Sequence, residues 1–79
     1  MLTQVNERTY ELRHERLESY LEIWQPSVAG SPGAGKWYWH WVAPHPSGGK
    51  TTGGIKGSEP QVFVAIEKAM VELEKRAAS

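Results

Sequence analysis

The stretch Trp37-Tyr38-Trp39-His40-Trp41-Val42 (WYWHWV) decides the fold of this 79-residue chain. Aromatic and β-branched residues favour a pleated, half-buried surface, so the stretch predicts a β-strand. Side chains alternate along a strand, which places the three tryptophans on one face and Tyr38, His40 and Val42 on the other. One of these two faces must pack against the rest of the core.

Two interpretations of this strand stay open. In the first, the tryptophan face forms the core against a C-terminal helix, together with Leu21, Ile23, Ile66, Met70 and Leu73. In the second, an open face of the sheet presents an aromatic platform made of Tyr20, Trp24, Tyr38 and His40. Aromatic side chains on an open sheet stack nucleobases, and they equally anchor a protein partner.

The residues on either side of the aromatic strand predict a small sheet. Alternating apolar residues predict a strand over residues 17–25, and the Gly, Pro and Ser of residues 26–36 predict a loop. After the aromatic strand, residues 44–49 predict a turn and residues 50–56 a short edge strand. The pair Gly53-Gly54 weakens that strand and indicates a bulge or an edge.

The C-terminal third of the chain predicts a helix. Ser58-Glu59-Pro60-Gln61 has the pattern of a capping box, with Ser58 as the N-cap and Gln61 at the third position, so we expect a helix over 59–77. The apolar face of this helix is made of Val62, Phe63, Ile66, Ala69, Met70, Leu73 and Ala77.

The expected fold class is α+β, a three-stranded antiparallel sheet packed on one C-terminal helix. We expect one small domain over 1–79, divided into a lead-in (1–16), the sheet (17–57) and the helix (58–79). The lead-in has an imperfect apolar pattern, and we expect it to be helical or irregular.

Composition excludes several classes of protein. Nine Lys and Arg balance nine Asp and Glu, which argues against binding nucleic acid by bulk positive charge. The absence of Cys excludes a disulfide scaffold, a Cys-based zinc site and a thiol nucleophile. No apolar run approaches the roughly 20 residues that span a bilayer. The N-terminal residues do not have the pattern of a secretory signal. We therefore expect a cytoplasmic domain that does not contact membranes.

Two stretches resemble phosphate-binding loops. Residues 30–36 (GSPGAGK) have the spacing GxxxxGK, but Trp37 occupies the position of the Ser or Thr that binds Mg²⁺, and a strand follows in place of a helix. Residues 49–51 (GKT) have Pro44 where the first glycine belongs. We expect Gly-rich hairpin turns at both places, and no bound nucleotide.

The remaining polar residues predict neither a metal site nor a catalytic site. His40 and His45 lie five residues apart, but no Cys or nearby carboxylate completes a set of ligands. Glu18 and Glu22 share a predicted strand face without a pocket that would shift their pKa values for acid–base chemistry. We therefore expect a non-enzymatic chain without a cofactor.

The order of strands and helix resembles two families. Residues 20–73, with LEIW, GKWYWHWVA, a Gly-rich third strand and the helix that opens at Ser58, are similar to one repeat of the YegP-like small bacterial domains. The resemblance implies no established activity. It implies pairing of repeats into one sheet, and hence dimerisation of a single repeat.

The second resemblance is to the three-stranded-sheet DNA-binding domain of phage-type integrases and plant ethylene-response factors. It implies that the open sheet face enters the major groove. The matching face here holds Glu18 and Glu22 beside the aromatic residues, which would repel phosphate, and only Lys36, Lys50 and Lys56 lie near strand ends where they reach a DNA backbone. Nucleic-acid binding is therefore the second choice of function.

The first choice is a protein-binding or self-associating module that acts through the sheet edge and the open aromatic face. The 50–56 segment is an expected edge, and edges pair with other chains. Val64 and Val71 lie on the helix side opposite the core face, where a monomer is normally polar. A homodimer would pair these edges or bury these valines, whereas a lead-in folded over the valines would leave a monomer.

Overall fold

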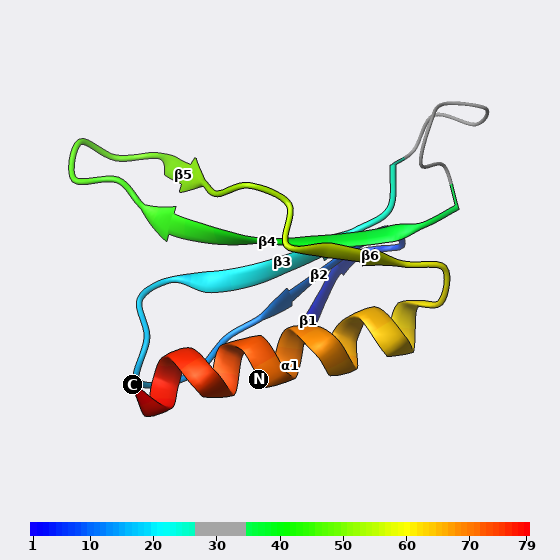
Figure 1. Cartoon of the computed structure of the whole chain (residues 1–79). Coiled ribbons are helices and arrows are strands. Elements are labelled where there is room, and N and C mark those ends of the chain that lie inside the picture. The colour runs from blue at the N-terminus through cyan, green and yellow to red at the C-terminus, as the bar shows by residue number, and fades with distance from the viewer. Residues whose placement is uncertain (27–34) are drawn as a thin grey trace.

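A computed structural model describes residues 1–26 and 35–79 of the chain. These parts fold into one antiparallel sheet with one helix beneath it (Figure 1). The elements are, in chain order, β1 (Leu2–Asn6), β2 (Thr9–Leu12), β3 (Tyr20–Trp24), β4 (Trp37–Pro44), β5 (Lys50–Thr52), β6 (Gly57–Glu59) and α1 (Val62–Ala78). The class is α+β, as the sequence predicts.

The sheet is larger than the sequence predicts. Strands β1, β2, β3 and β4 follow one another across it, and the far side of β4 pairs with both β5 and β6. Thr52 of β5 lies opposite Val42, and Gly57 of β6 lies opposite Trp39. The prediction of a three-stranded sheet is therefore wrong, because the described residues form a six-stranded sheet.

The lead-in accounts for two of the extra strands. Residues 2–12 form the β1–β2 hairpin, where a helical or irregular segment is expected, and β2 pairs with β3. The turn contains no glycine or proline. Instead, the side-chain oxygen of Asn6 accepts a hydrogen bond of 2.8 Å from the amide of Arg8, which stabilises a tight turn locally.

The edge beside β4 is one path interrupted by a bulge. Val42 and Trp39 lie three positions apart in β4, while their partners Thr52 and Gly57 lie five apart, so the edge holds two extra residues. Gly53 and Lys56 still donate backbone hydrogen bonds to Trp41 and Trp39 on either side. The interruption lies within residues 53–56, where the Gly53-Gly54 pair predicts a bulge or an edge.

The prediction of a capping box at Ser58 is wrong. Ser58 belongs to β6, opposite Tyr38, and the helix begins at Val62 after an N-cap at Gln61 whose side chain makes no capping hydrogen bond. Pairing of the Gly57–Glu59 backbone with β4 prevents these residues from taking up helical angles. The helix therefore begins three residues later than 59 and ends at Ala78.

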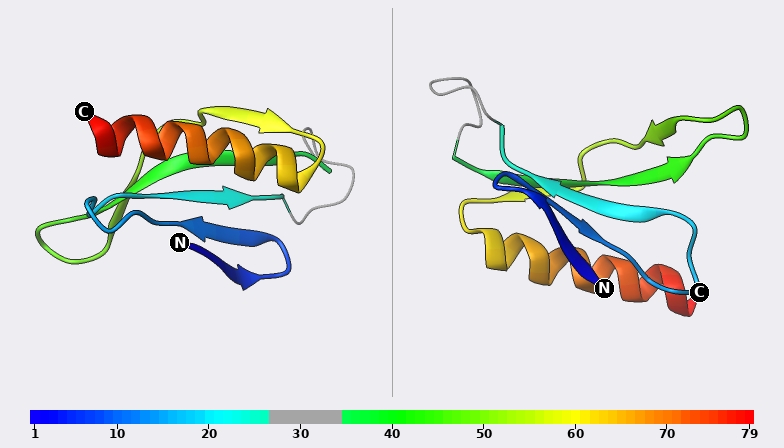
Figure 2. Two further views of the ribbon diagram at one scale, coloured as in Figure 1. Left: turned by 90° about the horizontal axis from the view of Figure 1, so that it is seen from below. Right: turned by 180° about the vertical axis from the view of Figure 1, so that it is seen from behind.

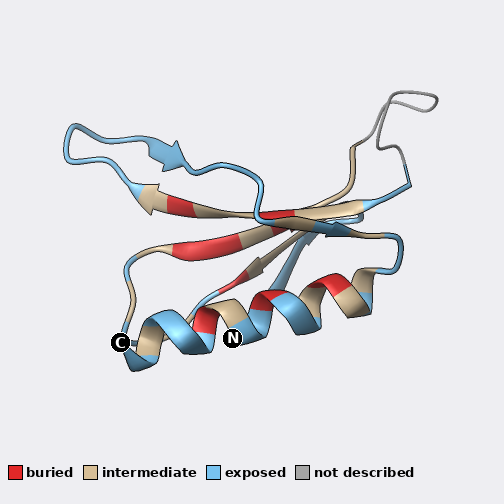
Figure 3. Ribbon diagram, viewed as in Figure 1, coloured by how far each residue is buried: buried red, intermediate tan, exposed pale blue. Residues whose placement is uncertain are grey.

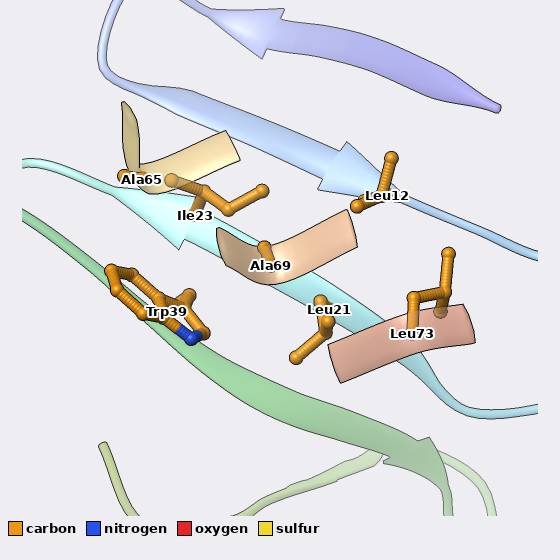
Figure 4. Packing of buried hydrophobic residues seen from close by; sticks show 7 residues of the cluster. All are labelled: Leu12, Leu21, Ile23, Trp39, Ala65, Ala69 and Leu73. Atoms are coloured by element: carbon orange, nitrogen blue, oxygen red, sulfur yellow. The ribbon is translucent and has the colours of Figure 1, made fainter. Parts of the chain in front are cut away.

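Small residues of α1 make the closest approach to the sheet. The helix buries Ala65, Ala69 and Leu73 against Leu12, Leu21, Ile23 and Trp39 (Figures 3 and 4). Trp37 and Trp41 flank this core and are partly buried. The tryptophan face of β4 is thus the face that packs on the helix, as the first interpretation predicts.

The helix covers only part of the sheet. It contacts β2, β3, β4 and β6, and it leaves β1 uncovered, as the view from below shows (Figure 2). Phe63 and Met70, which the sequence assigns to the core face, are 64% and 48% exposed. They lie too far around the helix from Ala65 and Ala69 to reach the sheet. No helix in residues 1–26 and 35–79 is long and apolar enough to cross a bilayer.

Candidate functional site

The open face of the sheet, opposite α1, brings together the predicted aromatic residues. In the pairing of β3 with β4, Tyr20 lies opposite Val42, Glu22 opposite His40 and Trp24 opposite Tyr38. All six side chains point away from the helix, because Leu21, Ile23 and Trp39 alternate with them and face it. The two interpretations of the aromatic strand are therefore compatible, one for each face.

Trp24, Tyr38 and His40 form a contiguous aromatic cluster. The ring centre of Trp24 lies 4.2 Å from that of His40 and 5.8 Å from that of Tyr38. The imidazole Nε2 of His40 lies 2.8 Å from a carboxylate oxygen of Glu22, which fixes the plane of the ring. All three aromatic residues are half-buried, so each keeps some surface for a ligand.

Tyr20 lies at the other end of the same face and is nearly covered. It is 4% exposed, with the guanidinium of Arg13 at 3.8 Å from its ring centre and the ammonium of Lys50 at 5.7 Å. Interaction with the Tyr20 side chain raises the pKa of Lys50 above its ordinary value. The Tyr20 hydroxyl is buried and has no partner within hydrogen-bond distance among the described residues.

The two carboxylates of the open face are both paired. Glu22 is bound to His40, and Glu11 of β2 lies 3.0 Å from the guanidinium of Arg13. Glu18, which the sequence places on this face, lies before β3 and is exposed. Because the Arg13 guanidinium is always charged, its pairing with Glu11 reduces the repulsion expected between this face and phosphate.

The other predicted site residues lie elsewhere. Lys56 lies on the link from β5 to β6, and its side chain pairs at 3.9 Å with Glu72 of α1, on the face of the sheet opposite the aromatic cluster. Val64 is half-buried, and Val71 is 54% exposed in a shallow groove with Glu67, Met70, Glu74 and Lys75. The lead-in does not cover these valines, because it joins the sheet.

Strand β1 is an exposed edge that the sequence pattern does not predict. All five of its residues are exposed, and it forms the end of the sheet. Thr3, Gln4 and Val5 carry a β-strand pattern, but no glycine or proline marks the turn that follows. Asn6, a turn-forming residue before the polar pair Glu7-Arg8, was the available signal.

One of the two stretches that resemble phosphate-binding loops is described in full. Gly48 and Gly49 have φ of 92° and 80° in the turn between β4 and β5, so the Gly-rich part is a hairpin turn, as predicted, while Lys50 and Thr51 belong to β5. Most of the stretch 30–36 lies outside the described residues. Within the described ranges no group of three His, Asp or Glu side chains is placed to hold a metal ion.

Comparisons of the chain with protein-family models, with curated proteins and with solved structures find no match. The likeness to YegP-like domains and to integrase-type sheets therefore remains a resemblance of sequence pattern.

Proposed function

We propose that the protein is a non-enzymatic protein-binding module that adds a partner strand to the free edge of its sheet at β1. The observation that supports this proposal is the contrast between the two edges of the sheet. Every residue of strand β1 (LTQVN) is exposed, and the strand has no charged side chain and no proline. An edge of that kind offers unpaired backbone groups to another chain.

The opposite edge carries features that discourage pairing. Strands β5 and β6 have three residues each, and a bulge separates them. Lys50, Lys56 and Glu59 place charges along this edge, and Pro60 follows it. Charges, prolines and bulges are the usual protection of an edge strand. We therefore place the proposed contact at β1, and not at the edge expected from the sequence over residues 50–56.

The outward backbone groups of β1 are set by its pairing with β2. Met1 and Arg13 exchange both backbone hydrogen bonds, so bonded and non-bonded pairs alternate from that point. Thr3 bonds to Glu11, while Leu2 and Gln4 belong to non-bonded pairs with Leu12 and Tyr10. The N–H and C=O groups of Leu2 and Gln4 therefore point away from the sheet.

Apolar surface lies beside this edge. Leu2 shares the helix side of the sheet with Leu12, and it is 45% exposed because α1 does not extend over β1. A strand added at β1 would lengthen the sheet and shield Leu2 from water. Backbone hydrogen bonds supply affinity in this mode of recognition, and alternate side chains supply specificity.

Extended peptides selected from a random display library are expected to shift the amide resonances of Leu2 and Gln4 in two-dimensional NMR spectra. Gln4→Pro removes one outward N–H without removing a β1–β2 bond, and an edge strand tolerates proline there. We expect it to weaken peptide binding about tenfold, since tenfold equals ~1.4 kcal/mol, the scale of one hydrogen bond.

Gln4→Ala, which keeps the N–H, is the matched control and is expected to bind within about threefold of the unmodified chain. Selected peptides that shift only open-face residues, or that bind the proline variant equally well, would contradict the proposal.

The second candidate function is nucleic-acid binding through the open face. It is favoured by the cluster of Trp24, Tyr38 and His40, and by the pairing of both carboxylates on that face. Stacking of one base on such an aromatic side chain contributes about 1–3 kcal/mol. The balanced net charge keeps this function second.

If this candidate holds, affinity for a single-stranded oligonucleotide falls steeply with salt concentration, because bound phosphates release counterions. Lys50→Ala is expected to reduce the salt slope, since Lys50 borders the open face. Lys56→Ala, on the helix side, is the matched control and is expected to leave the slope unchanged. Equal slopes in both variants, or no binding at low salt, would exclude the open face as a nucleic-acid site.

A further inference from the structure

We infer that the strand added at β1 is the β1 strand of a second copy of this chain, paired antiparallel about a twofold axis through Thr3. This inference rests on the proposed function and names its partner. The pairing would join two sheets into one continuous sheet, with a bond pattern that the existing hairpin determines.

The register between the two β1 strands follows from the backbone groups of β1 that do not pair with β2. Leu2 and Gln4 are the residues whose N–H and C=O groups point outward, and they lie symmetrically about Thr3. In an antiparallel pair centred on Thr3, Leu2 of one copy exchanges both bonds with Gln4 of the other, and the reverse holds across the axis. This register pairs all the outward backbone groups of Leu2 and Gln4 with one another.

The side chains are compatible with self-pairing. The strand has no charge, so no like charges are placed opposite each other. Thr3 meets its own symmetry mate on the open face in a non-bonded pair, and threonine pairs of this kind are favourable. The register shift between Gln4 and Asn6 bends the strand there and limits the pairing to residues 2–4.

The contrast between the two edges also predicts a closed assembly. A sheet with two open edges would add copies without limit, whereas a sheet with one open edge forms a twofold dimer and stops. Here β1 is open, and the β5–β6 edge is short, charged and bulged. A twofold axis perpendicular to the sheet keeps both copies of α1 on the same face.

A contact of three residues per strand predicts a weak dimer. It falls below the roughly 1,200 Å² that stable interfaces bury, so association belongs to the transient class. Sedimentation equilibrium is expected to give a mass near 8.9 kDa in dilute solution and a rise toward twice that value as the concentration approaches about 1 mM. NMR signals of Leu2 and Gln4 are expected to shift over the same concentration range.

Two variants test the register. Gln4→Pro removes an outward donor, and Thr3→Lys places two ammonium groups opposite each other across the axis. Both are expected to stay at 8.9 kDa at every concentration, while Gln4→Ala associates like the unmodified chain. NMR spectra of each variant establish that the β1–β2 hairpin is intact.

Three results would overturn the inference. They are a constant monomer mass up to about 1 mM, a dimer that survives both variants with an intact hairpin, and a dimer that Val71→Lys dissolves. If the chain is monomeric but selected peptides still shift Leu2 and Gln4, the second-copy inference fails while the proposed function stands. If neither peptides nor a second copy engage β1, both fail.

Discussion

Replacement of Trp39 by alanine is expected to leave most of the chain unfolded at 25 °C. Trp39 is 6% exposed and packs between β4 and α1 with Leu21, Ile23, Ala65 and Ala69 (Figure 4). Removing a buried tryptophan costs about 3–5 kcal/mol, because transfer energy is lost and a cavity remains. A single core in a chain of this length rarely contributes more than ~3–5 kcal/mol in total.

Trp24→Ala is the matched control, because it removes the same side chain from the neighbouring strand on the opposite face. Trp24 is half-buried and contacts His40 and Tyr38, so its loss removes aromatic contacts of about 0.5–1.5 kcal/mol but opens no cavity in the core. Far-UV circular dichroism during urea titration measures both. A Trp39→Ala chain that unfolds cooperatively at nearly the urea midpoint of the unmodified chain would contradict the assigned core.

The aromatic strand and its two faces could be predicted from the sequence because alternation along a strand is purely local. Strand β4 runs over Trp37–Pro44, and parity alone places Tyr38 with His40 on one face and Tyr20 with Trp24 on one face. That both pairs share the same face depends on the register between β3 and β4. Which face receives the helix depends on contacts with distant residues, and the strand pattern alone does not determine that choice.

The β1–β2 hairpin could not be predicted from side-chain alternation in the same way. Its turn depends on a hydrogen bond from the amide of Arg8 to the side chain of Asn6, and residues 3–25 contain no glycine or proline to announce it. The edge β1 and its outward groups exist only because β2 pairs with β3. The sequence therefore holds only one local signal for the proposed binding edge, the turn-forming Asn6, and the strand pairing that creates the edge is not visible in it.

For the helix, the hydrophobicity pattern predicted part of the core face wrongly. The spacing places Phe63 and Met70 with the core, but the helix turns its alanines to the sheet. Ala65 and Ala69 allow the helix backbone to approach closely, and this leaves room for the indole of Trp39 between the layers. Packing of a large side chain against small ones determined the rotation of the helix.

Replacement of Gly57 by alanine is expected to cost about 1–3 kcal/mol, the usual range for overpacking a core. The indole of Trp39 lies against the Gly57 backbone across the β4–β6 pair. A Cβ atom at Gly57 would stand 2.5 Å from Cζ2 and 2.7 Å from Cη2 of that ring, well inside contact distance. Either the indole must leave the core or β6 must separate from β4, and thermal unfolding measures the loss.

Gly54→Ala is the matched control, because it makes the same change on the same edge, where no atom of the described residues lies within 4 Å of the new Cβ. It is expected to be neutral or slightly stabilising, since alanine lowers the entropy of the unfolded chain. A double-mutant cycle with Trp39→Leu then isolates the clash, because leucine lacks the two ring atoms that meet the new methyl group. In that background Gly57→Ala is expected to lose most of its cost. If it costs as much beside leucine as beside tryptophan, the contact between Gly57 and the indole is not the reason that glycine occupies this position.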